Sequence, residues 1–148
     1  MAADLSITAA NIDFTNAGMQ YVDPNVTAAA ALTAAQVVYL TSSNTIDKCN
    51  TTTATLANAL GVVVNTSVSS GQQMLVARSG QVVTGMPTMV AGTVYYVSGT
   101  GGTHASSAAG GICTFADLTT GEYVTILGVA LTTTTLYLNI YATGITKA

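Results

Sequence analysis

The sequence predicts an all-β protein, a single compact β-barrel or sandwich of two similar halves preceded by an extended N-terminal arm. Strand-like segments rich in Val, Ile, Thr and Tyr alternate with turn signals about 8–12 residues apart, which is typical of β-sandwiches and barrels. Charged residues make up only 6% of the 148 residues. Thr, Ser and Asn therefore supply most of the polar surface, and β-branched residues favour strands.

The clearest strand covers residues 136–141, where the apolar Leu136, Leu138 and Ile140 alternate with more polar neighbours. This period of two is that of a strand with one buried face. Further strands are expected at residues 37–41, 62–66, 73–78, 81–84, 93–98, 111–115 and 123–127. Turn signals fall at residues 70–71, 79–80, 91–92, 98–102 and 120–121. The alanine-rich residues 28–35 and 55–60 give weak helix signals, so little helix is expected.

An internal repeat supports the two halves. Residues 34–40 resemble residues 90–97, and Leu-Gly-Val at residues 60–62 recurs at residues 127–129. Two copies are too few for a solenoid, which needs at least about three repeats. We therefore predict two β-meanders that close into one barrel, because closure removes the strand edges that so few charges could protect.

Residues 1–31 differ from the barrel domain expected at residues 32–148. They contain three of the six acidic residues and no cation, and their apolar side chains are scattered. Such a segment either orders on a neighbouring subunit or wraps its own barrel. The apolar residues offered as contacts to a capsid or a sister subunit are Leu5, Ile7, Ile12, Phe14 and Tyr21.

Arg78 is the only arginine, and it follows an otherwise apolar strand. It is a candidate for an ion pair between subunits, and the alternative is an exposed charge at the end of a strand.

The charge balance excludes several classes of function. Three Lys and Arg residues and a net charge of −3 cannot neutralise the six to ten phosphates that a typical nucleic-acid-binding protein contacts. There is no basic patch for anionic lipid. The most apolar stretch, residues 28–40, falls short of the roughly 20 residues that span a bilayer, and no signal peptide is visible. No nucleic-acid or membrane partner is expected.

Catalytic and metal-binding patterns are weak. The only histidine, His104, lies in a Gly- and Ser-rich stretch without a nucleophile elbow. Asp4, Asp13 and Asp23 lack the spacing of a calcium loop. Asp117 and Glu122 flank a turn, where we expect solvated charges. The sequence therefore predicts no enzyme, no cofactor and no metal site.

Two cysteines, Cys49 and Cys113, are too few for a disulfide framework. They are either two small buried residues or one bridge.

Four segments carry a resemblance to a known family: residues 32–40, 59–63, 90–97 and 126–131. Together with the strands between them they resemble the small β-barrel decoration (cement) proteins of tailed-bacteriophage capsids, over residues 32–144. In that family a turn and strand of the type L-T-A-G-x-V-Y precedes each barrel half, and L-G-V-A opens a following strand. Ala35 stands where the family usually has glycine.

The resemblance implies a structural virion protein that is assembled in the host bacterial cytoplasm, binds the outer surface of the capsid and stabilises it. Its partners would be the major capsid protein and itself, as a homotrimer at three-fold or quasi-three-fold positions. The alternatives are a phage fibre or head-fibre module that binds a host glycan, or another shell or surface-layer subunit. Glycan binders usually present exposed aromatic residues, and the chain has seven tyrosines and no tryptophan.

Overall fold

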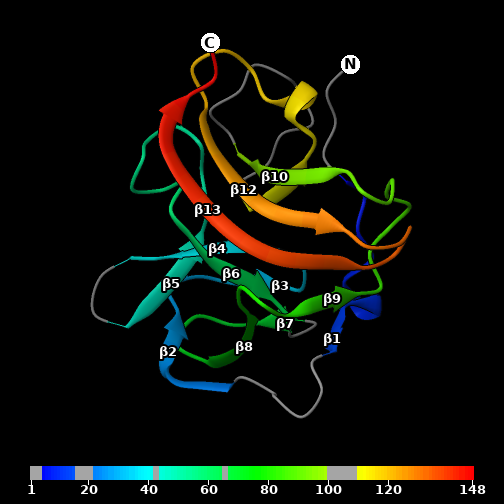
Figure 1. Cartoon of the computed structure of the whole chain (residues 1–148). Helices are drawn as coiled ribbons and strands as arrows, with labels where there is room; N and C mark the ends of the chain where they lie inside the picture. The colour runs from blue at the N-terminus through cyan, green and yellow to red at the C-terminus, as the bar shows by residue number, and fades with distance from the viewer. Residues whose placement is uncertain (1–4, 16–21, 42–43, 65–66, 100–109) are drawn as a thin grey trace.

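The computed structural model describes residues 5–15, 22–41, 44–64, 67–99 and 110–148. The described chain is all-β (Figure 1). Its elements are η1 (Ala9–Asn11), β1 (Asp13–Thr15), β2 (Val22–Ala28), β3 (Leu32–Thr33), β4 (Val37–Leu40), β5 (Thr45–Lys48), β6 (Ala59–Val63), β7 (Ser67–Val68), β8 (Gln73–Ala77), β9 (Val82–Thr84), β10 (Val94–Ser98), β11 (Gly111–Cys113), η2 (Phe115–Asp117), β12 (Tyr123–Ala130) and β13 (Leu136–Thr146).

The strands of the described residues form three sheets. A closed barrel has the order β2-β5-β4-β6-β8, and a six-stranded sheet has the order β1-β9-β13-β12-β10-β11. The short strands β3 and β7 pair separately. The six-stranded sheet is a curled half-barrel, and its strands β12 and β13 curve past β6 of the closed barrel (Figure 1).

The strands expected from the alternating pattern are present. Their bounds differ in places: β12 and β13 run several residues beyond their predicted ends, β6 covers residues 59–63 instead of 62–66, and β11 ends at Cys113. The strand β5 is not predicted by the pattern. Register shifts between Tyr123 and Thr125 and between Ile126 and Gly128 interrupt the period of two along this pair. Because such β-bulges put extra residues into one strand, sequence alternation alone underestimates the length of both.

The N-terminal segment differs from the expected arm. β2 pairs in parallel with β5 and antiparallel with β8, and so closes the barrel, while β1 pairs with β9. The domain boundary expected after residue 31 thus comes after β2, which is itself a strand of the barrel. The described part of the segment therefore packs on its own barrel, which is the second of the two alternatives. The pattern does not reveal β2, because Pro24 interrupts it and its partner strands lie far along the chain.

The predicted repeat is a structural repeat, but its two halves do not close into one barrel: the first half closes with β2, and the second half belongs to the curled sheet. Strands β5-β4-β6-β8 of the barrel match β11-β10-β12-β13 of the curled sheet, in the same order and with the same antiparallel pairing. Val37 pairs with Val62 in the first half as Val94 pairs with Val129 in the second. A register shift follows one residue later in both halves.

The turn before each half confirms the resemblance between residues 34–40 and 90–97. Ala35 has φ +70° and Gly92 has φ +82°. The Ala35 N–H donates to Val63 O at 2.7 Å, and the Gly92 N–H donates to Ala130 O at 2.8 Å. The alanine thus occupies the left-handed conformation that glycine usually provides.

Two large apolar clusters fill the described part of the molecule, beside a small third one of Cys113, Leu118 and Val124. One lies inside the closed barrel and includes Val38, Val63 and Val76. The other lies between the barrel's outer wall and the inner face of the curled sheet, where Val37 and Val62 meet residues such as Leu127, Leu136 and Leu138. The first half, in the barrel, therefore packs into the concave side of the second half, in the curled sheet.

Both cysteines are buried, and they form no disulfide. Burial raises the pKa of the Cys49 thiol above its ordinary value. Since the thiolate is the reactive form and both thiols are buried, we expect neither to react with a disulfide reagent such as dithiobis(2-nitrobenzoate) in the folded protein at pH 8. Both should react at once in 6 M guanidinium. Rapid reaction of either thiol in buffer alone would contradict the burial.

Candidate interaction surface

The residues proposed from the sequence as contacts are largely used by the chain itself. Ile12 is buried in the core, and Leu5 and Ile7 pack half-buried against the same cluster. The Leu5 N–H donates to Ile112 O on β11 at 3.0 Å. The expectation that Ile12 contacts a capsid or a sister subunit is therefore corrected, because its side chain is covered within its own chain.

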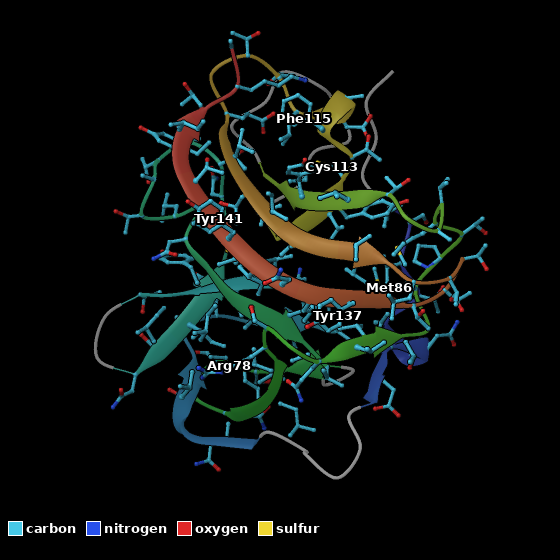
Figure 2. All side chains as sticks on the ribbon, viewed as in Figure 1. Arg78, Met86, Cys113, Phe115, Tyr137 and Tyr141 are labelled. Atoms are coloured by element: carbon cyan, nitrogen blue, oxygen red, sulfur yellow. The ribbon has the colours of Figure 1, made fainter. Side chains whose placement is uncertain are left out.

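The remaining three proposed contacts have different outcomes. Phe14 pairs with Val83 through β1 and β9, and its side chain is not among those described. Tyr21, like His104, lies outside the described residues. Arg78 is half-buried at the end of β8 (Figure 2), and its backbone N–H donates to Gln81 Oε1 at 2.7 Å. Among the proposed contacts whose side chains the structure describes, Leu5, Ile7 and Ile12 pack on one core cluster, and Arg78 lies apart at the end of β8.

A different surface stands out on the outer face of β10, β12 and β13. Val94, Tyr137 and Tyr141 are 38%, 37% and 63% exposed, and both tyrosines belong to β13 (Figure 2). Ile126 and Val129 lie half-buried on the same sheet. We call these five side chains the outer face. None of the three strands contains a charged residue.

A hollow opens within the outer face. Its volume is about 170 Å³, and it is lined by Val94, Ile126, Gly128, Val129, Tyr137 and Asn139. Gly128 contributes no side chain there, and an added Cβ would point into the neighbouring backbone, 1.8 Å from Tyr137 O. The surface is therefore an apolar sheet with a depression beside an exposed tyrosine.

The sequence contains part of the signal for this face. Alternation in residues 136–141 places Tyr137 and Tyr141 opposite the buried Leu136 and Leu138. What the pattern cannot show is that Val94 and Val129 lie on the same face, since that depends on the pairing of β10 with β12 and of β12 with β13.

Of the two expected solvated turn charges, Asp117 is half-buried and Glu122 is not solvated. Glu122 is 1% exposed. One carboxylate oxygen, Oε1, accepts from Thr51 Oγ1 at 2.6 Å, and the other, Oε2, accepts from the Thr119 N–H at 2.5 Å and from Thr119 Oγ1 at 2.9 Å. Asp117 caps η2 through the backbone N–H of Thr114 at 3.1 Å. Both carboxylates therefore satisfy local donors.

Glu122 is the fourth residue of a turn whose geometry recurs along the chain. In five four-residue turns of the described chain, the third residue has positive φ, and the backbone N–H of the fourth residue donates to the carbonyl of the first. In four of them a Gln or Glu side chain at the fourth position also accepts the N–H of the first residue. These side chains belong to Gln36, Gln72, Gln81 and Glu122.

A second depression lies beside β12. It measures about 370 Å³ and is lined by residues of the 54–58 loop with Tyr123, Thr125, Ala142 and Gly144. The Thr125 hydroxyl is buried and donates to Ala57 O at 2.6 Å. This size falls within the roughly 300–1,000 Å³ of ligand pockets, but the cleft is open and has mixed polarity.

Among the described residues, no three His, Cys, Asp or Glu side chains come close enough to hold a metal ion. No helix in the described part of the chain has the length and hydrophobicity to cross a membrane. No family model matches the chain, and no significant match was found among curated proteins or solved structures.

Proposed function

We propose that this chain is a structural protein that binds the outer surface of a tailed-phage capsid and stabilises it. The observation that carries the proposal is a surface suited to assembly in a protein shell: the uncharged outer face of β10, β12 and β13, which exposes Val94, Tyr137 and Tyr141 on one sheet. Contiguous apolar patches on a soluble protein mark interaction sites, and tyrosine is enriched at interfaces between proteins.

The placement of the family-like segments supports the proposal. The turns that hold Ala35 and Gly92 precede β4 and β10. Gly61 and Gly128 lie at matching positions in β6 and β12. These are the turn–strand units that carry the resemblance to decoration proteins. Their equivalent geometry favours a duplicated β-barrel scaffold of the kind that the family uses.

The chemistry of the surface is also suited to dense packing. Only 6% of the residues are charged, so neighbouring copies repel one another weakly even at the high local concentration of a shell. Many identical weak contacts then add up through avidity. The homotrimer implied by the resemblance is part of this proposal.

Co-sedimentation tests the proposal directly. The purified full chain is mixed with empty, expanded capsid shells assembled from the major capsid protein of the same phage, and the bound fraction is measured against concentration. We expect saturable binding at a fixed ratio to the capsid subunits and a higher melting temperature of the shell. Absence of binding to both expanded and unexpanded shells would reject a capsid role.

A glycan-binding module is the second candidate, and the cleft beside Tyr123 and Asn58 is the observation that favours it. Aromatic and amide side chains around an open cleft of mixed polarity can stack on a sugar and hydrogen-bond to it. A glycan-array signal that is lost in Tyr123→Ala and kept in Tyr137→Ala, together with no shell binding, would favour this function instead.

A further inference from the structure

The internal repeat gives the outer face a counterpart whose environment is known. By strand register, Val94 corresponds to Val37, and Val129 corresponds to Val62. Tyr137 pairs with Val129 as Ala77 pairs with Val62, so Tyr137 corresponds to Ala77. The second half therefore presents to solvent the same strand face that the first half presents to its neighbour.

In the first half this face is covered. Val37, Val62 and Ala77 are 0%, 1% and 0% exposed and belong to the core cluster that joins the barrel to the curled sheet. An uncharged β-face with this pattern thus packs against an apolar β-sheet within the same molecule. Burial of such a face is favourable because it removes apolar surface from water.

The solvent-facing copy is the bulkier of the two. Tyr137 stands where the barrel has Ala77, and Ile126 stands where it has Ala59, since Ile126 pairs with Tyr96 as Ala59 pairs with Tyr39. A face that met only water would gain nothing from these larger apolar groups. A second protein surface, in contrast, gains buried area from each of them, and aromatic residues dominate the energetics of such contacts.

We propose that copies of this chain meet through the outer face, each copy presenting it toward the symmetry axis of the assembly. The partner must offer an apolar, uncharged β-surface, and the outer face of a second copy has that chemistry. With no charged residue on β10, β12 or β13, two such faces approach without like-charge repulsion. The inference rests on the proposed role as a shell subunit and assigns the contact between copies.

The hollow in the outer face gives the contact between copies a place where a side chain can insert. It lies beside Tyr137 and is floored by Gly128, so a side chain of a neighbouring copy can enter it. The exposed Tyr137 and Tyr141 are the bulky groups that the face itself supplies for this. In a symmetric assembly the residues near the axis contact their own equivalents, so each copy both offers a tyrosine and receives one.

Sedimentation velocity of the full chain over a wide concentration range tests the inference without any capsid present. The wild-type protein should sediment as an oligomer of 14.9 kDa chains. The oligomer should contain two copies around a two-fold axis or three copies around a three-fold axis. Val94→Asp and Tyr137→Asp should each weaken association at least about 100-fold, because an unpaired carboxylate in an apolar contact is strongly disfavoured.

Leu40→Asp is the matched control. Leu40 is 49% exposed on β4, away from the outer face, and the variant adds the same charge. It should associate like the wild type, and circular dichroism should show all three variants folded. A monomeric wild type, or unchanged association of the two outer-face variants, would overturn the inference. If the wild type is monomeric yet saturates capsid shells, the inference fails while the proposed function stands.

Discussion

Replacing Gly128 by alanine should lower the free energy of unfolding by at least about 3 kcal/mol. The added Cβ would lie 1.8 Å from Tyr137 O and 2.8 Å from Tyr137 C. Both are backbone atoms of the paired strand β13, so no side chain can rotate away. The substitution must therefore force β12 and β13 apart where the second sheet has its register shift. Urea unfolding followed by circular dichroism measures the effect.

Gly92→Ala is the control for this variant. Gly92 has φ +82°, and a Cβ added there would meet no described atom of a non-adjacent residue within 4 Å. Ala35 already occupies the matching turn at φ +70°. We expect a cost of only about 1–2 kcal/mol, that of a left-handed alanine. Gly61→Ala should resemble Gly128→Ala, since its Cβ would lie 2.3 Å from Ala77 O. Equal stability of Gly128→Ala and Gly92→Ala would contradict the close approach of the strands.

Glu122→Ala should destabilise the fold by about 3 kcal/mol, because it removes the acceptor for three hydrogen bonds at a buried site. The Thr51 hydroxyl and the Thr119 N–H and hydroxyl all donate to this carboxylate. Thr51 belongs to the segment between β5 and β6, so the carboxylate ties that segment to the 119–122 turn. Thermal unfolding of the variant beside the wild type gives the change.

Glu122→Gln tests whether the role is that of the turn or that of the charge. Gln36, Gln72 and Gln81 accept the same backbone hydrogen bond in the corresponding turns. The amide nitrogen can in addition donate to Thr51 Oγ1, which accepts as well as donates. We expect this variant to stay within about 1 kcal/mol of the wild type. A loss as large as that of Glu122→Ala would show that the negative charge itself is required.

The sequence by itself determined the fold class, the main strands and the internal repeat. These depend on local patterns, because alternation of apolar side chains and a Gly or Ala at the left-handed turn position act over a few residues. Leu136, Leu138 and Ile140 line the inner side of β13 as the alternation predicts. The same local signals located the turns at Gly71, Gly80, Gly92 and Gly121, all of which have positive φ.

Only the tertiary structure decided which surfaces are covered. Val37 and Val94 follow equivalent turns, yet the first is buried and the second is exposed. The reason is that the curled sheet covers Val37 on the barrel, whereas Val94 lies on the outer side of the curled sheet itself. Glu122 is buried for a similar reason, since Thr51 reaches it from 71 residues away in the sequence. The placement of β2 in the barrel also depends on distant strands. Pairing between distant strands creates these environments, and a local pattern carries no information about it.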